Sequence, residues 1–137
     1  MRILGRHLIV ELCDCSRAVL DDTVALEEHM KESVRRAGAT IVSSVFHRYN
    51  PQGVSGVIVI AESHFSIHTW PEYGYAAVDF FTCGSSVDPY RALEYLKDAV
   101  RAQECHVSEI KRGMPSDREE LIDHKPLTQL SATTARA

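Results

Sequence analysis

The stretch AESHFSIHTWPEYGYAAVDFFTCG, residues 61–84, decides the fold, because it reads as two β-strands joined by a short turn. Aromatic and β-branched residues fill 64–70 and 75–83, and the PEYG segment between them carries proline and glycine. If that segment closes an antiparallel hairpin, the numbers of facing residues sum to about 146. Ser63 then lies opposite Cys83, or one position away, at the open end of the hairpin.

Four further strands are expected outside this hairpin. Apolar or β-branched runs place them at 3–12, 39–49, 54–61 and 104–111. The NPQG segment at 50–53, between the second and third of these runs, has the composition of a turn.

Two helices are expected between the strands. The first has N-cap candidates at Asp21, Asp22 and Thr23 and ends at Gly38. Its apolar side chains recur every four positions and form one buried stripe of Leu26, Met30 and Val34. The second begins at Asp88-Pro89, a capping residue followed by proline at the first helical position. Its apolar face comprises Ala92, Leu93, Leu96, Ala99 and Val100.

This order of elements predicts an α+β fold, a two-layer sandwich in which two helices cover one face of an antiparallel sheet. We expect residues 1–112 to form a single domain. Residues 113–137 are polar and contain two prolines, so we expect a loose C-terminal tail.

Composition excludes several functional classes. The net charge of −4 and the lack of a Lys/Arg run argue against a nucleic-acid partner. No apolar run reaches membrane-spanning length and no signal-peptide cleavage pattern follows the N-terminus, so we expect a cytoplasmic protein with no membrane partner. The four cysteines, Cys13, Cys15, Cys83 and Cys105, form no CxxC pair and should stay reduced.

Reactive residue types gather in and around the hairpin. His64 and His68 are four positions apart, which on a strand spans roughly 13 Å, so we expect no metal site there. Ser63 lacks the GxSxG setting of a hydrolase nucleophile, but its position near Cys83 brings two nucleophilic side chains together.

A second cluster is expected at the other end of the same strand. The hairpin between 54–61 and 64–70 puts Ser55 across from the region of His68 to Trp70. Ser63 and His68 have opposite parity on the strand and are separated by roughly 16 Å. We therefore expect two clusters, Ser63 with Cys83 and Ser55 with His68, which a symmetric dimer could join across its two-fold axis.

The segment GVSGVIVIAESHFSIHTWPEYGYAAVDFFTCG, residues 53–84, strongly resembles the short prokaryotic S-adenosylmethionine decarboxylase proenzymes, which depend on a pyruvoyl group. The segments LGRHLIVEL and GATIVSSVFHRYNPQGVSG fit the same family. The resemblance covers about residues 3–112, and the remaining tail carries none of it.

The resemblance implies that the chain cleaves itself between Glu62 and Ser63 into a small chain, 1–62, and a large chain, 63–137. In that chemistry the Ser63 hydroxyl attacks the Glu62 carbonyl, the resulting ester eliminates, and hydrolysis leaves a pyruvoyl group at position 63. The pyruvoyl ketone forms a Schiff base with the substrate amine and accepts electrons as CO₂ leaves. No metal is implied.

The resemblance also assigns roles to other residues. Cys83 is implied as the proton donor in turnover, and His68, helped by Ser55, as the base of self-processing from the partner subunit. Tyr49 is implied to stack on adenine and Glu72 to hold the ribose hydroxyls of S-adenosylmethionine, and Trp70 offers the sulfonium an aromatic face. The product would be the aminopropyl donor for spermidine biosynthesis, made by a homodimer of two small and two large chains.

Two alternatives remain open at this point. An arginine or ornithine decarboxylase on the same scaffold would share Ser63, His68 and Cys83 but would replace the adenine-stacking ring. A non-cleaving partner subunit that activates another chain would be free to lose those residues and would stay at full length.

Overall fold

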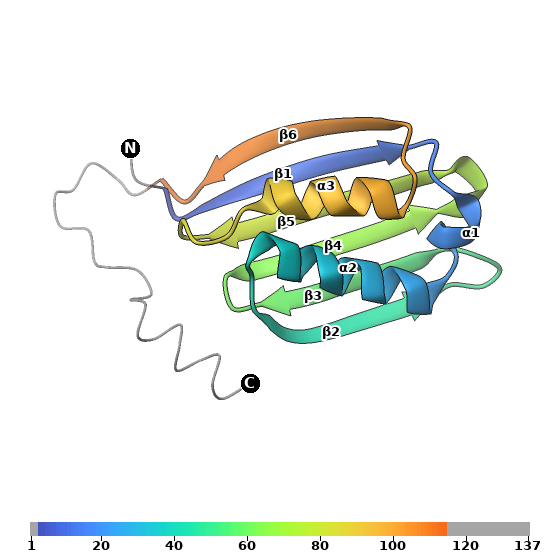
Figure 1. Cartoon of the computed structure of the whole chain (residues 1–137), viewed down its shortest axis with the longest axis horizontal. Helices are drawn as coiled ribbons and strands as arrows, with labels where there is room; N and C mark the ends of the chain where they lie inside the picture. The colour runs from blue at the N-terminus through green and yellow to red at the C-terminus, as the bar shows by residue number, and fades with distance from the viewer. Residues whose placement is uncertain (1–2, 115–137) are drawn as a thin grey trace, which may run out of the picture.

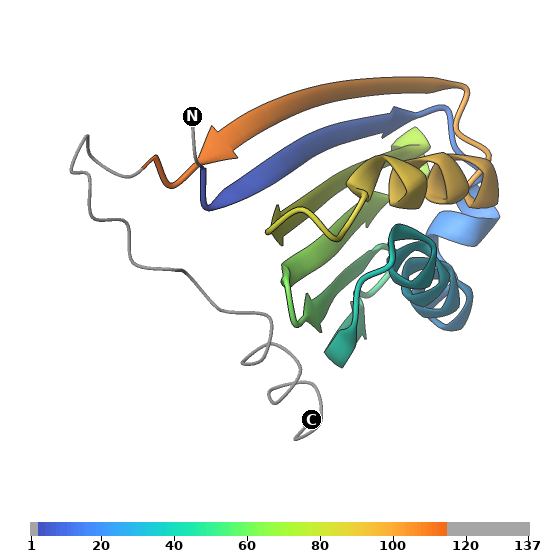
Figure 2. The ribbon, with the colours of Figure 1, turned by 60° about the vertical axis from the view of Figure 1, so that its left-hand side comes forward.

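The computed structural model describes residues 3–114 and consists of one six-stranded sheet covered on one face by helices (Figure 1). The elements in chain order are β1 (Gly5–Cys13), α1 (Arg17–Leu20), α2 (Thr23–Ala37), β2 (Ile41–Arg48), β3 (Val54–Ile60), β4 (Ser63–Trp70), η1 (Pro71–Tyr73), β5 (Tyr75–Cys83), α3 (Pro89–Ala99) and β6 (Glu104–Arg112). The sheet order is β2-β3-β4-β5-β1-β6, and each neighbouring pair is antiparallel. The predicted α+β class, with two long helices on one face, is confirmed (Figure 2).

The local signals for both long helices hold in the structure. Asp22 caps α2 by accepting a hydrogen bond from the Ala25 N–H at 3.0 Å, and Gly38 ends the helix in the left-handed conformation. Asp88 caps α3, with Pro89 in its first turn. Asp22 is therefore the cap among the three candidates offered by the sequence.

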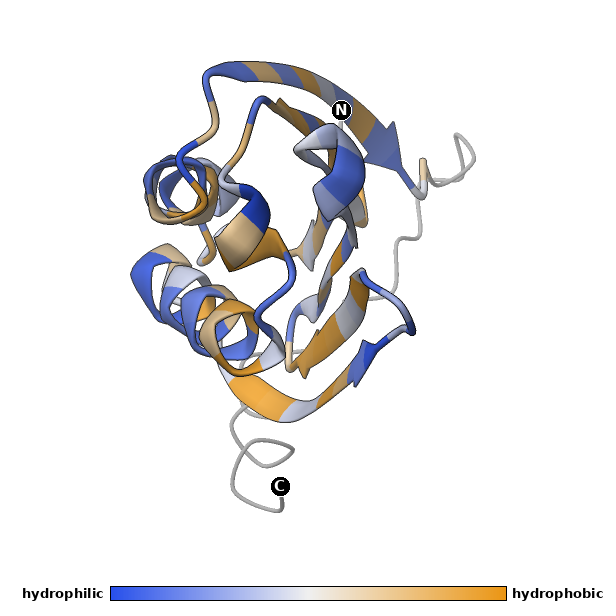
Figure 3. Cartoon of the chain, turned by 90° about the vertical axis from the view of Figure 1, so that its right-hand side faces the viewer, coloured by the Kyte–Doolittle hydropathy of each residue, from blue (hydrophilic) through white to orange (hydrophobic). Residues whose placement is uncertain are grey.

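The core lies between the helices and one face of the sheet. The side chains of β4 and β5 alternate between buried and less buried positions. Figure 3 shows bands of hydrophobic and hydrophilic residues along the strands. The largest fully buried side chains are Phe65, Phe80, Leu8, Leu12, Leu20, Leu26, Met30, Ile58, Ile67, Leu96, Val10 and Val34. At about 25 cal/mol per Å² of apolar area, burial of this layer is the main stabilising contribution to the fold.

The opposite face of the sheet has no helix over it. Directly paired residues share a face of a sheet, so Val45 and Val57 lie on this open face, as do His64 and Phe81. The open face also exposes apolar side chains, namely Ile9, Val45, Val59 and Ile110. Such a face on a small domain is typical of a protein–protein contact.

Two short elements were not predicted. Helix α1 is a single turn whose Ser16 cap and buried Leu20 connect β1 to α2; four residues are too few to show a helical period. The PEYG segment is a 3-10 turn, η1, closed by the Gly74 N–H donating to the Pro71 carbonyl at 3.0 Å.

All four cysteines are free, as expected. In residues 3–114 no helix has the length and apolar character to cross a bilayer. The predicted tail lies almost entirely outside the described residues.

Candidate active site

The turn between β3 and β4 contains the Glu62–Ser63 peptide bond and is held by the segment that leads into β2. The Ala61 N–H donates to the Thr40 carbonyl at 2.9 Å, and the Thr40 N–H donates to the Glu62 carboxylate at 3.0 Å. The Glu62 side chain is buried. Its carboxylate is therefore a fixed part of the turn rather than a solvated group.

The backbone at this bond is both polarised and strained. The Cys83 N–H donates to the Glu62 carbonyl oxygen at 2.7 Å. Ser63 has a φ of 139°, in a region that residues with a side chain rarely adopt and that costs about 1–3 kcal/mol. The carbonyl that a neighbouring hydroxyl would attack thus already accepts a hydrogen bond, in a backbone segment that cleavage would relax.

The pairing of Ser63 agrees with the hairpin prediction. Ser63 pairs with Thr82, one place from Cys83, and Trp70 pairs with Tyr75, so the register sum is 145. The positive φ interrupts the regular alternation at Ser63, so the parity argument does not extend to that residue.

Thr82 is buried and its hydroxyl has no hydrogen-bond partner among the described residues, a feature that sequence reasoning missed.

The second predicted cluster also forms. Ser55 pairs with His68 in the register of β3 and β4, and the Ser55 Oγ lies 2.7 Å from the His68 Nδ1. This hydrogen bond fixes the imidazole ring and leaves Nε2 free for another partner. His68 is exposed, on the face of the sheet that the helices leave uncovered.

An open cleft of about 430 Å³ lies beside this cluster. It is lined by Tyr49, Gln52, Gly53, Ser55, His68, Thr69, Trp70 and Glu72. The structure thus brings five predicted site residues into one cleft: Tyr49, Ser55, His68, Trp70 and Glu72. Ser63 and Cys83 do not line it, because they lie at the other end of β4.

The aromatic side chains of the cleft are half-exposed and offer faces to a ligand. Tyr49 is 49% exposed and meets the His47 ring edge-on at 4.7 Å between centroids. Trp70 is 42% exposed and stacks on Tyr75 at 5.3 Å, so it is not a core residue. Stacking of this kind positions planar surfaces for aromatic or cationic groups.

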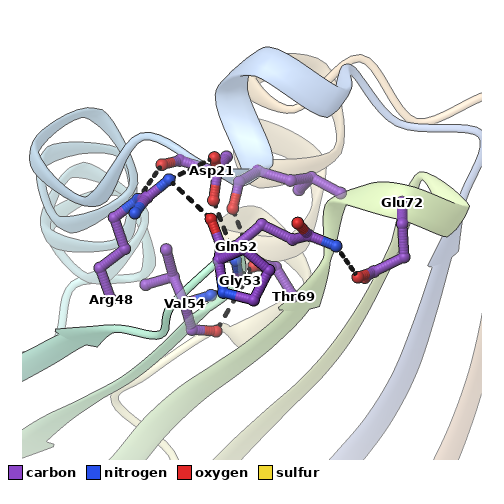
Figure 4. Close-up of polar contacts among 9 residues, drawn as sticks. Asp21, Arg48, Gln52, Gly53, Val54, Thr69 and Glu72 are labelled. Atoms are coloured by element: carbon purple, nitrogen blue, oxygen red, sulfur yellow. Dashed lines mark hydrogen bonds and ion pairs between the residues drawn. The ribbon is translucent and has the colours of Figure 1, made fainter.

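Glu72 is held by a residue that sequence reasoning missed. The Gln52 side-chain amide donates to the Glu72 carboxylate, with Nε2 2.5 Å from Oε2 (Figure 4). The NPQG composition of residues 50–53 predicted only a turn. A glutamine in a turn that faces another turn carries no signal in a single sequence.

The open face carries a third polar cluster, around Asp79. His7 Nε2 and His64 Nε2 lie 2.6 and 3.0 Å from Asp79 Oδ2, and the Ser66 hydroxyl donates to Oδ1. These two histidines and Asp79 have the donor types and spacing of a metal site. Because Arg112 can only donate, its contact at 3.2 Å makes His7 Nδ1 an acceptor and leaves the His7 proton on Nε2, facing Asp79. Hydrogen bonds thus engage both ring nitrogens of His7 and both carboxylate oxygens of Asp79. His64 contacts these residues and not His68.

Comparison with known proteins places this geometry in a family. A family model described as S-adenosylmethionine decarboxylase matches residues 6–113. An S-adenosylmethionine decarboxylase proenzyme of Thermotoga maritima is 58% identical over 113 residues, which cover 82% of this chain and 87% of that protein. One from Caldicellulosiruptor saccharolyticus is 51% identical over 114 residues, covering 83% of this chain and 92% of that protein.

The fold agrees with a solved structure as well. The crystal structure of the adenosylmethionine decarboxylase from Aquifex aeolicus matches with a TM-score of 0.81 and 31% sequence identity, covering 88% of this chain and all (100%) of that chain. The family match spans the sheet, both long helices and both ends of β4. The chain belongs to the S-adenosylmethionine decarboxylase family.

Proposed function

We propose that the chain cleaves itself at Glu62–Ser63 and then decarboxylates S-adenosylmethionine in a site shared by two subunits. Its family makes it a decarboxylase that is synthesised as a self-cleaving zymogen. The observation that carries the assignment of the bond is the backbone at Ser63, where a positive φ and a hydrogen-bonded carbonyl coincide.

Cleavage begins with an acyl shift. The Ser63 Oγ attacks the Glu62 carbonyl carbon, the C–N bond breaks, and the nitrogen of Ser63 takes up the proton released from the hydroxyl to become a free amine. The negative charge that develops on the carbonyl oxygen faces the Cys83 N–H, which lies 2.7 Å away before reaction. Relief of the strain at Ser63 lowers the free energy of the ester relative to the amide.

The ester is then opened by β-elimination. A base removes the Ser63 α-proton, and the Glu62 carboxylate leaves from the β-carbon. We assign the base to His68 of a second subunit, with its ring oriented by Ser55 at 2.7 Å. The dehydroalanine that remains at the new N-terminus takes up water and releases ammonia, which produces a pyruvoyl group at position 63.

The surroundings of Ser63 fit such a group. Position 63 becomes the first residue of β4 and stays anchored by pairing with Thr82, while Cys83 continues the neighbouring strand. A pyruvoyl carbonyl supplies an electron acceptor for decarboxylation of a bound amino acid. Cys83 follows the pairing partner of position 63 directly in sequence, and we assign its thiol to return a proton to the substrate α-carbon.

The cleft supports a nucleoside substrate. Tyr49 offers a half-exposed ring for adenine, Glu72 offers a carboxylate for ribose hydroxyls, and Trp70 offers an aromatic face to a sulfonium. The residues that line the cleft include one carboxylate, Glu72. An arginine enzyme would need carboxylates placed for a guanidinium instead of the stacking ring.

A two-fold dimer would complete the site. Within one chain, Ser63 and His68 are five residues apart along β4, roughly 16 Å. Pairing of two open faces would cover the exposed Ile9, Val45 and Val59 and bring the Ser63 end of each chain to the His68 end of its partner. Each dimer would then contain two equivalent sites.

Intact mass and a turnover assay test the proposal together. The expected result is two fragments split at Glu62–Ser63, with the larger carrying a pyruvoyl N-terminus, and release of CO₂ from S-adenosylmethionine but not from arginine or ornithine. A chain that stays at full length would support the non-cleaving partner subunit, and CO₂ release from arginine would move the assignment to the related decarboxylases.

A further inference from the structure

The loop between β2 and β3 carries two cleft residues and is closed by a hydrogen bond between its two ends. Tyr49 lies at its start, Gln52 near its end, and the Tyr49 N–H donates to the Gly53 carbonyl at 2.7 Å. Gly53 has a φ of 101°, and a Cβ there would lie 3.1 Å from the Thr69 carbonyl. The loop is therefore a closed turn packed against β4, and its position depends on what holds Gly53.

Asp21 holds this turn in place, although it does not line the cleft described above. One carboxylate oxygen accepts a hydrogen bond from the Gly53 N–H at 2.9 Å, and the other accepts one from the Arg48 guanidinium at 2.7 Å (Figure 4). The Gly53 N–H and the Arg48 guanidinium lower the pKa of the Asp21 carboxyl, so both bonds are made by the charged form. The same guanidinium also lies 3.4 Å from the Pro51 carbonyl. Asp21 thus fixes both ends of the loop.

The segment that carries Asp21 is itself anchored to the sheet. The buried Thr69 hydroxyl donates to the Leu20 carbonyl at 2.8 Å and accepts from the Val54 N–H at 2.9 Å. These two bonds tie the end of α1 to β4 and to the start of β3, directly after the loop. The backbone next to Asp21 is therefore anchored to the sheet, which fixes the position of its carboxylate.

Gln52, in the same loop, contacts Glu72, the residue assigned to the ribose. Because Gln52 donates to Oε2 of Glu72 at 2.5 Å, the other carboxylate oxygen is left to accept hydrogen bonds from a ligand. Displacement of the loop would move the Tyr49 ring and release the Glu72 carboxylate together. A misplacement of about 1 Å in such a site can cost two orders of magnitude in efficiency.

We propose that Asp21 is a positioning residue for the nucleoside subsite, acting through Gly53 and Arg48 on Tyr49 and, through Gln52, on Glu72. This inference rests on the proposed function, because it assumes that the cleft binds the nucleoside part of the substrate. Asp21 contacts neither the Ser63 junction nor Cys83 in the structure. Its loss should therefore weaken binding and leave self-cleavage intact.

Three variants test the inference. Asp21→Ala removes both carboxylate acceptors, and Arg48→Met removes the guanidinium and keeps an unbranched apolar stem. The control is Asp22→Ala, which deletes the neighbouring cap of α2 and so destabilises the fold without touching the loop. Each protein is compared with the wild type by intact mass, by KM and kcat for S-adenosylmethionine, and by calorimetric binding of 5′-methylthioadenosine, which keeps the nucleoside but cannot be decarboxylated.

Asp21→Ala should raise KM and the dissociation constant of 5′-methylthioadenosine by about tenfold, the effect of losing a hydrogen bond to a charged group, with kcat within about twofold and complete cleavage. Arg48→Met should give a smaller rise of about threefold, and Asp22→Ala should lower the melting temperature without changing either constant.

Two results would count against these assignments, and they are distinguishable. If the wild type cleaves and turns over but both loop variants keep its KM and dissociation constant, Asp21 has no positioning role. If the wild type neither cleaves nor turns over S-adenosylmethionine, the proposed function falls and this inference falls with it.

Discussion

The two ends of β4 are built in opposite ways. At the Ser63 end the chemistry lies in the backbone: a strained φ of 139°, a carbonyl that accepts the Cys83 N–H at 2.7 Å, and a buried Glu62. At the His68 end it lies in exposed or half-buried side chains, with a Ser55–His68 hydrogen bond and aromatic rings around an open cleft.

The difference follows from what each end has to do. Cleaving a peptide bond once requires a rigid junction whose carbonyl is oriented before reaction, and a sheet supplies that orientation through its ladder hydrogen bonds. Binding and releasing a small molecule many times requires accessible faces and space. Each chain holds one example of each end, and the dimer proposed above would combine them.

Co-expression of two inactive variants is the strongest test of whether the Ser63 end and the His68 end of one site come from different chains. Ser63→Ala and His68→Ala should each stay at full length when expressed alone. In mixed dimers one site regains Ser63 from one chain and His68 from the other, so up to about half of the His68→Ala chains should cleave when the two are made in equal amounts. Intact mass of chains with distinguishable tags measures that fraction.

The matched control is His106→Ala, which replaces an exposed histidine on β6 that lies 3.7 Å from the Glu104 carboxylate. It should cleave fully when expressed alone. Mixed expression that yields no cleaved His68→Ala chain would place the base in the same chain as Ser63 and remove the argument for a shared site.

Replacing the thiol at Cys83 separates the two functions assigned to that residue. Cys83→Ala keeps the backbone N–H that faces the Glu62 carbonyl, so cleavage should proceed, while kcat should fall by about 10²–10⁴ through loss of the proton donor. Cleavage is followed by mass and turnover by CO₂ release. Cys105→Ala, a half-buried cysteine on β6, is the control and should retain its turnover. Equal losses of cleavage and turnover in Cys83→Ala would mean that the thiol acts in both.

The strain at Ser63 predicts an unusual order of stability. Ser63→Gly and Ser63→Ala should both remain uncleaved, but glycine adopts the positive φ without penalty. Ser63→Gly should therefore melt above Ser63→Ala by about 2–6 °C, although glycine normally destabilises strands. Calorimetry of the two uncleaved proteins measures the difference. A lower melting temperature for Ser63→Gly would show that the backbone at this position is not strained.

The smallest expected effect is the contribution of Asp21 to the stability of the folded protein at low pH. The Gly53 N–H and the Arg48 guanidinium lower the pKa of Asp21 in the folded protein, so Asp21 contributes stability above its unfolded pKa. That contribution is lost as pH falls through the folded value. The melting temperatures of wild type and Asp21→Asn should thus differ by a constant amount above about pH 5 and converge below about pH 4. Thermal melts across pH 3–7 (about four pH units) test this, and a difference that grows toward low pH would contradict it.

Much of the fold could be predicted from local patterns. The alternation in 75–83, the caps at Asp22 and Asp88, and Gly38 after the last turn of α2 each carry their own physical reason over a few residues. The sum for one hairpin placed Ser63 within one position of Cys83, and the neighbouring hairpin placed Ser55 across from the region of His68 to Trp70, because pairing in a regular ladder is arithmetic. The roles assigned to these residues remain predictions that the experiments above test.

Local sequence patterns thus predicted the succession of long helices and strands along the chain and the two clusters along β4, and the quoted motifs predicted the family. Three features emerged only from the folded chain: the strained backbone at Ser63, the contacts of His7 and His64 with Asp79, and the support of the cleft by Asp21 and Gln52. These features join residues that are 15 to 72 positions apart or depend on a dihedral angle, and neither leaves a periodic signal in a chain.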